Sequence, residues 1–257
     1  MRHNMWISAP SPTKVDIINA LGRTYGWTSY LEICSWSTGR KYAYIDQSIY
    51  TIKHRLMYSV YPGFNDGSPI DFLSATPDIS GCISEIESRR LTYDVILVDP
   101  WHEYLTSYRD IELAFRWIKP TGTIVVHDCH PGNDSSVSPA AQEGEWSGVT
   151  FEAYIDFVRN RRPELDFFTV DIDHGCGLIR RRGERRLLTY PFAPTVRLKS
   201  SPSIDGLDQV EEEWKSSYGD HGRRLLLFEE HADKLLRLRS YAEFLDDLRQ
   251  DSEPGSS

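Results

Sequence analysis

The sequence predicts an α/β protein built on an open, mostly parallel sheet, and three observations lead to this prediction. Short apolar runs alternate with stretches of helical periodicity between residues 29 and 131. Two of these runs end in clusters of Asp and His, and two later runs, near residues 167–179, are spaced as a closing hairpin. Because ligands bind beyond the carboxyl ends of the strands in such sheets, we expect the site at these clusters.

The elements before residue 90 follow from local patterns. A helix is expected over 13–21, ended by Gly22, and a buried strand over 29–34, followed by a turn of small residues from Ser35 to Gly39. A helical turn at 41–47, a second strand at 49–53 and a third strand at 70–73 come next, and Asp78 lies in a turn that starts a helix.

The central part carries the strongest pattern. The run from Tyr93 to Val98 ends at Asp99-Pro100-Trp101-His102-Glu103-Tyr104, and the run 122–126 ends at His127-Asp128-Cys129-His130. An apolar stripe at helical spacing lies between them and stops at Lys119-Pro120. A right-handed crossover would make this segment a βαβ unit, with both polar clusters opening into one crevice.

The remaining segments give the domain boundaries. We expect an N-terminal helical segment over 1–28, the main domain over 29–183, a Pro/Ser-rich linker over 184–206 and a helical C-terminal extension over 207–257. Within the main domain, residues 132–144 are expected to form a lid, and a helix over 149–161 precedes the hairpin. The apolar stripe of the extension should pack on its own domain or on a second copy of the chain, forming a homodimer.

Composition excludes several classes of protein. A net charge of −9 argues against a nucleic-acid partner, and no apolar run is long enough to span a membrane or to serve as a signal peptide, so a cytoplasmic location is expected. The four cysteines include no CxxC pair, which disfavours a disulfide framework or a structural zinc site.

The order of the motifs resembles the class I S-adenosylmethionine-dependent methyltransferases, and within them a subfamily of small-molecule and sugar O-methyltransferases. The matching segments are Tyr30-Leu31-Glu32-Ile33 with Gly39, Asp99 to Tyr104, Arg109-Asp110, His127-Asp128, and Asp173-His174-Gly175-Cys176-Gly177. The resemblance implies a Rossmann-like seven-stranded sheet, mostly parallel with a closing antiparallel hairpin, and S-adenosylmethionine as the cofactor. The residues that would bind this cofactor are Glu32, Ser35, Gly39, His54, Asp78 and Asp99.

Two positions depart from the family pattern. Cys34 stands where the first motif normally has a glycine, which changes how closely the cofactor can approach the backbone. The acidic residue that holds the ribose at the end of the second strand is replaced by His54-Arg55, so that ribose recognition falls to His54 or to another residue.

The two strand-end clusters supply the predicted chemistry. Methyl transfer to an aliphatic hydroxyl requires a base, and His102, three residues after Asp99, suits that role, with Asp99 and His127 as further catalytic candidates. In metal-dependent relatives the strand-four aspartate binds the ion, so Asp99, Asp128 and His130 are the expected ligands of Mg²⁺ or another divalent cation. Tyr104 and Trp146 would line the pocket for the acceptor, a hydroxyl of a sugar, a glycan or a related natural product.

Three other functions remain open from the sequence. Asp99-Pro100-Trp101 has some likeness to the motif of amino-methylating nucleic-acid enzymes, although the second proline is missing. The Asp/His clusters would also suit a metal-dependent hydrolase. A catalytically silent binding module, in which Cys34 and His54 mark a degenerated cofactor site, is the third alternative.

Overall fold

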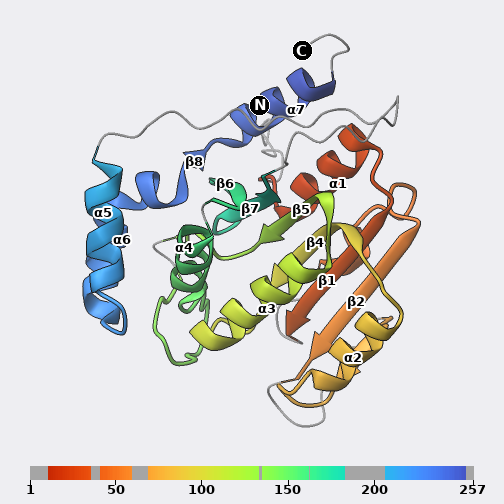
Figure 1. The fold of residues 1–257 in the computed structure, drawn as a ribbon, viewed down its shortest axis with the longest axis horizontal. Coiled ribbons are helices and arrows are strands. Elements are labelled where there is room, and N and C mark those ends of the chain that lie inside the picture. Colours follow the sequence, from red (N-terminus) through yellow and green to blue (C-terminus); the bar gives the residue numbers. More distant parts are fainter. Residues whose placement is uncertain are drawn as a thin grey trace, which may run out of the picture.

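The protein is an α/β fold around one twisted sheet, seen in a computed structural model that describes residues 11–35, 41–59, 69–132, 135–161, 163–182 and 206–252 (Figure 1). The strands are β1 Ser29–Ser35, β2 Ile52–Tyr58, β3 Phe72–Ser74, β4 Tyr93–Asp99, β5 Ile118–Val126, β6 Leu165–Val170, β7 Cys176–Arg181 and β8 Leu238–Arg239. The helices are α1 Lys14–Tyr25, α2 Ser80–Ser88, α3 Tyr104–Trp117, α4 Thr150–Asn160, α5 Leu207–Ser216, α6 His221–Leu236 and α7 Tyr241–Ser252, with a 3-10 turn, η1, at Tyr42–Tyr44.

The strand order confirms the predicted fold class. The sheet runs β3-β2-β1-β4-β5-β7-β6-β8. The pairs from β3 to β5 are parallel, whereas β7 is antiparallel to both β5 and β6 and closes the sheet as a hairpin. The expected seven strands are all present, and β8 adds an eighth strand, parallel to β6, that comes from the C-terminal extension.

Side chains of the strands alternate between the two faces of the sheet, and each face packs against a different set of helices. On β4, Ile96 and Val98 lie in a cluster with α2, α3, α4 and the helices α5 and α6. Val95 and Leu97 face the other side, where they join α1 and α7. Because both faces are covered, the central strands are mostly apolar, and Glu32 in the middle of β1 is a buried exception.

Several predicted boundaries were wrong, and β5, expected over 122–126, begins at Ile118. The helix α1 continues past Gly22, where a Cβ atom would lie 2.5 Å from the Ile49 side chain, and it ends at Gly26, which has a φ of +66°. Gly22 is therefore a site of close packing, whereas Gly26 has the left-handed conformation that ends a helix. The second strand, expected over 49–53, begins at Ile52 and continues to Tyr58, because residues 55–58 are the buried part of the segment. The third strand, expected over 70–73, covers Phe72–Ser74.

The C-terminal extension is helical, as expected, and packs on the main domain. At the buried interface with α4, the Arg224 guanidinium lies 2.9 Å from Asp156 Oδ2, and the Trp214 indole donates a hydrogen bond to Asp156 Oδ1 over 2.7 Å. The predicted linker over 184–206 lies outside the described residues except for Gly206. Among the described residues, no helix is long and apolar enough to cross a membrane.

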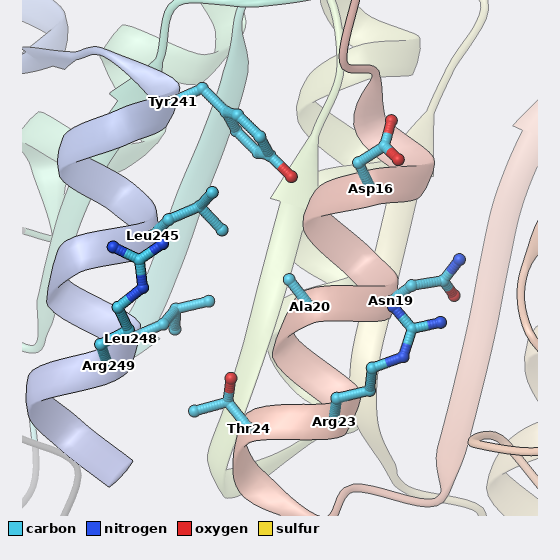
Figure 2. A pocket seen from close by; sticks show the side chains of 9 residues that line it. All are labelled: Asp16, Asn19, Ala20, Arg23, Thr24, Tyr241, Leu245, Leu248 and Arg249. Atoms are coloured by element: carbon cyan, nitrogen blue, oxygen red, sulfur yellow. The ribbon is translucent and has the colours of Figure 1, made fainter. Parts of the chain in front are cut away.

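The last helix lies against the first one. Figure 2 shows Tyr241, Leu245 and Leu248 of α7 facing α1. These side chains and residues of α1 line a cavity of about 450 Å³. The Tyr25 hydroxyl at the end of α1 donates a hydrogen bond to Asp251 Oδ2 over 2.7 Å. These contacts hold α1 between the sheet and the C-terminal helix.

Candidate active site

Three carboxylates converge around one histidine at the carboxyl end of the sheet. His127, directly after β5, places its Nδ1 2.8 Å from Asp128 Oδ2 and 3.3 Å from Asp99 Oδ1 at the end of β4. Its Nε2 lies 3.6 Å from Asp173 Oδ2, in the turn between β6 and β7. Burial disfavours a charge on His127, but Asp128 and Asp99 more than offset this effect and raise its pKa well above the usual value. His127 is therefore a cation within an acidic cluster.

A buried lysine from the first helix enters the same cluster. Lys14 Nζ lies 2.5 Å from Asp99 Oδ2, and both side chains are almost completely buried. The backbone N–H of Lys14 also donates to Asp173 Oδ2 over 3.0 Å, and Lys41 Nζ lies 3.3 Å from Asp173 Oδ1. Burial opposes the ionisation of both Asp99 and Lys14, yet their mutual attraction lowers the pKa of Asp99 and raises that of Lys14. The pair is ionic, because a buried charge is tolerated only with a partner.

His102 has a fixed orientation. Its Nδ1 lies 2.6 Å from the Trp146 carbonyl oxygen, which can only accept a hydrogen bond, so Nδ1 carries the proton. The other ring nitrogen, Nε2, is buried, lies 3.0 Å from Asp128 Oδ2, and has no well-formed hydrogen bond to any described residue. Burial alone would lower the pKa of His102, but the Asp128 charge outweighs burial and raises it. Nε2 is the atom that can take up a proton or hold an ion.

Asp128 has a strained backbone, which turns its side chain into the cluster. Its φ is +59°, in the left-handed region that Asp tolerates better than most residues. Its Oδ1 accepts a hydrogen bond of 2.8 Å from the Ser147 hydroxyl, and its pKa lies well below the usual range because the attraction of His127 and His102 outweighs the effect of burial. Strain of this kind is found most often at functional sites.

The donor set suits a divalent cation. Asp99, His102 and Asp128 each offer a ligand atom, and these atoms lie within 4.8 Å of one another. The contact from His102 Nδ1 to a backbone carbonyl is the usual way in which a metal-binding histidine is held. The buried Nε2 of His102 and the carboxylate oxygens therefore fit such an ion, although Lys14 already contacts one oxygen of Asp99.

The structure does not bring His130 into this set. Its Nδ1 lies 2.7 Å from Asp171 Oδ1, and its ring contacts Phe228 of α6. The backbone N–H groups of Cys129 and His130 donate to Gly175 and His174, so the chain leaves the cluster directly after Asp128. Of the three expected metal ligands, Asp99 and Asp128 come together, and His102 stands where His130 was predicted.

The expected cofactor residues are only partly brought together. Glu32 and Ser35 are buried on β1, and Asp99 on β4 lies opposite Cys34, next to Ser35, whereas Gly39 lies outside the described residues. Burial raises the pKa of Glu32 to about 8, and its Oε2 has no hydrogen-bond partner among the described residues.

His54 and Asp78 lie apart from this group. His54 is in the middle of β2, in register with Leu31, and its Nδ1 lies 2.9 Å from the Tyr93 hydroxyl. It therefore does not reach the carboxyl end of the sheet, because β2 continues to Tyr58. Asp78 is exposed and accepts a hydrogen bond from the Ser80 N–H at the start of α2.

The two expected acceptor residues differ in position. The Trp146 ring packs 4.9 Å from the Trp101 ring and 5.4 Å from the His102 ring, between centroids. Tyr104 points away from the cluster, because its hydroxyl donates to Asp156 Oδ2 over 2.7 Å. It lines a separate cavity of about 560 Å³ with Tyr108 and Tyr218.

Three charged residues of the site were not among the predicted site residues. Asp173 was noted only as part of the hairpin motif, and Lys14 and Lys41 were not singled out. A buried aspartate needs a cationic partner. The expected burial of Asp99 was therefore the only indication that a lysine or arginine from elsewhere in the chain would enter the site.

No model of a known protein family matches the chain, and no curated protein matches its sequence. Solved structures give low-identity matches. An O-methyltransferase from Streptomyces achromogenes involved in tomaymycin synthesis, in complex with SAM, is 12% identical, with 66% of this chain and 79% of that chain covered and a TM-score of 0.49. An O-methyltransferase from Bacillus cereus in complex with SAH is 12% identical over 68% of this chain and 83% of that chain, with a TM-score of 0.47. A SAH-bound methyltransferase from Podospora anserina is 13% identical over 66% of this chain and 78% of that chain, with a TM-score of 0.43.

Proposed function

We propose that this chain is an S-adenosylmethionine-dependent O-methyltransferase. The observation that carries the proposal is the convergence of Asp99, His102 and Asp128 at the carboxyl ends of β4 and β5. The sheet that holds them has the parallel order and closing hairpin that the resemblance implies. Ligands of open α/β sheets bind at this edge.

The cofactor would lie over the ends of β1 and β4. The Oε2 atom of the buried Glu32 has no hydrogen-bond partner among the described residues and is suited to a hydrogen bond with a ligand, since a buried polar atom without a partner is costly. Ser35 and Asp99 lie at the same edge of the sheet. S-adenosylmethionine would supply an electrophilic methyl group there.

His102 is the proposed general base. Its Nδ1–H is held by the Trp146 carbonyl, so Nε2 is oriented to accept the proton that the acceptor hydroxyl loses. Asp128, 3.0 Å from Nε2, stabilises the imidazolium that forms. His127 and Lys14 keep Asp99 and Asp128 ionised and in place.

A divalent cation is the alternative arrangement of the same groups. Asp99, His102 and Asp128 would hold it, and it would supply Lewis acidity that lowers the pKa of the acceptor hydroxyl. A single Nε2 lone pair cannot serve as base and ligand at once. The contact between Lys14 and Asp99 favours the base, because Asp99 is already neutralised.

We assign the acceptor to a hydroxyl of a sugar, a glycan or a related natural product. The support for this class is the pair of indole rings, Trp101 and Trp146, beside His102. Aromatic faces with a polar handle suit the flat, partly apolar faces of such molecules.

The first test is calorimetric titration of the full chain with S-adenosylhomocysteine, with EDTA and then with added Mg²⁺. Micromolar binding is expected, and no binding to a folded protein would refute the cofactor assignment. A panel of hydroxyl-bearing acceptors is then assayed for methyl transfer. The His102→Ala variant should lose about 10²–10⁴-fold in kcat, the usual contribution of a general base, whereas His231→Ala in α6 should match the wild type. Activity that survives EDTA favours the base arrangement.

A further inference from the structure

The contact between Lys14 and Asp99 has a consequence for ion binding. Lys14 Nζ lies 2.5 Å from Asp99 Oδ2, and the side chains are 6% and 1% exposed. Asp99 is also one of the three residues whose ligand atoms lie close enough to hold a metal ion. An ammonium group and a divalent cation would therefore compete for the same carboxylate.

The rest of the cluster is arranged for a cation at that place. His102 Nε2 is buried and has no well-formed hydrogen bond to a described residue, although it lies 3.0 Å from Asp128 Oδ2. His127 has both ring nitrogens buried among carboxylates, again without well-formed hydrogen bonds to described residues. The donors of the candidate ion site are therefore His102 Nε2 and the carboxylate oxygens of Asp99 and Asp128, and the His127 cation lies beside them.

We propose that Lys14 is the cation that neutralises Asp99 in the working site, and that removing its charge converts Asp99, His102 and Asp128 into a tight site for a divalent cation. Lys14 is a positioning residue in this account, because it acts through Asp99 and not on the acceptor. The proposal deepens the proposed function, on which it rests for the role of Asp99. It also explains why the first helix, which precedes the main domain, contributes a residue to the centre of the site.

Mn²⁺ alone is the probe, added to the full chain without cofactor or acceptor and followed by calorimetry and by electron paramagnetic resonance of the free ion. Lys14→Met keeps the length of the apolar stem and removes the charge. We expect it to bind Mn²⁺ at least about tenfold more tightly than the wild type, because a unit charge at contact distance changes an ionic interaction by more than that factor. Mn²⁺ should also raise the Tm of Lys14→Met more than that of the wild type.

Three further variants make the result specific. Lys14→Gln removes the charge but retains a polar group that can still reach Asp99. It should show the same gain in affinity for Mn²⁺, and it replaces Lys14→Met in the test if that variant does not fold. Lys14→Arg keeps the charge and should bind Mn²⁺ as weakly as the wild type. In the double variant Lys14→Met with Asp99→Asn, the gain should disappear.

A matched control exists at the other end of the same strand. Lys119 Nζ lies 2.9 Å from Asp94 Oδ1, a lysine–aspartate pair at the start of β4. Lys119→Met should leave the affinity for Mn²⁺ unchanged. Equal affinity of the wild type and Lys14→Met, or no binding to either, would overturn the proposal. Because this measurement needs no methyl transfer, its failure is distinguishable from failure of the methyltransferase assignment, which is tested by S-adenosylhomocysteine binding.

Discussion

The glycine at position 148 offers a direct test of how His102 is held. Gly148 has a φ of +54°, and a Cβ atom there would lie 2.3 Å from the His102 carbonyl oxygen and 2.7 Å from the His102 Cβ. That oxygen is not free to move, since it accepts a hydrogen bond of 2.9 Å from the Val149 N–H. An alanine at position 148 therefore has to displace the backbone of His102.

The size of the effect follows from two contributions. A side chain in the left-handed region costs roughly 1–2 kcal/mol. Overpacking against a fixed backbone adds about 1–3 kcal/mol. The Gly148→Ala variant should thus lose about 2–5 kcal/mol of its free energy of unfolding, and its kcat should fall because His102 Nε2 moves away from Asp128.

A control lies in the same loop. Gly144 also has a positive φ, +93°, but a Cβ atom there would meet nothing within 4 Å. The Gly144→Ala variant should lose only the roughly 1–2 kcal/mol of the left-handed conformation, without overpacking, and should keep its kcat. Urea unfolding followed by tryptophan fluorescence measures both stabilities. If the two variants had equal stability and equal activity, the reasoning that the loop positions His102 would be refuted.

Three more predictions concern the interior. Burial raises the pKa of Glu32 to about 8, so the folded state keeps a proton that the unfolded state loses near pH 4.5. The free energy of unfolding therefore falls as the pH rises from about 4.5 to about 8. Glu32→Gln should therefore be more stable than the wild type at pH 8 by up to about 4 kcal/mol in urea unfolding, with little difference near pH 4.5. Arg224→Met leaves the buried Asp156 without its ionic partner and should lower the free energy of unfolding by about 3–5 kcal/mol in the same assay. A decrease below about 1 kcal/mol would contradict a buried ion pair there. Ser147→Ala removes a hydrogen bond to the charged Asp128, worth about 1.5–3 kcal/mol, and should lower kcat by roughly tenfold or more without a change in S-adenosylhomocysteine affinity.

The parts of the fold that the sequence predicted well are those with strong periodicity. The run at β4 and the strand-end clusters at Asp99 and Asp128 lie where expected, because residues 95–98 and 124–126 are unbroken buried apolar runs that end at these clusters. The hairpin of β6 and β7 was confirmed for the same reason. Both ends of β2 were misjudged, since its first three residues are exposed or half-buried and no apolar pattern marks where the strand begins.

The composition of the site was harder to predict, because it depends on contacts between distant residues. Lys14 and Asp99 are separated by 85 positions, and a lysine at the start of an amphipathic helix normally faces solvent. His130 does not join Asp99 and Asp128, because the left-handed backbone of Asp128 turns the chain away from the cluster directly after that residue. His102 takes the place that was predicted for His130. Neither feature has a local sequence pattern.

The packing of α7 on α1 has a consequence for how the protein is made. The residue that reaches Asp99 belongs to α1, whereas the outer contacts of that helix come from α7, and the hydrogen bond from Tyr25 to Asp251 spans 226 positions. A ribosome therefore has to release the chain through α7 before α1 is fully enclosed, and loops this long close late. We expect a nascent chain arrested before residue 241 to remain sensitive to protease within α1 after its central strands have become resistant. Synthesis to the last helix would then be the step that completes the site.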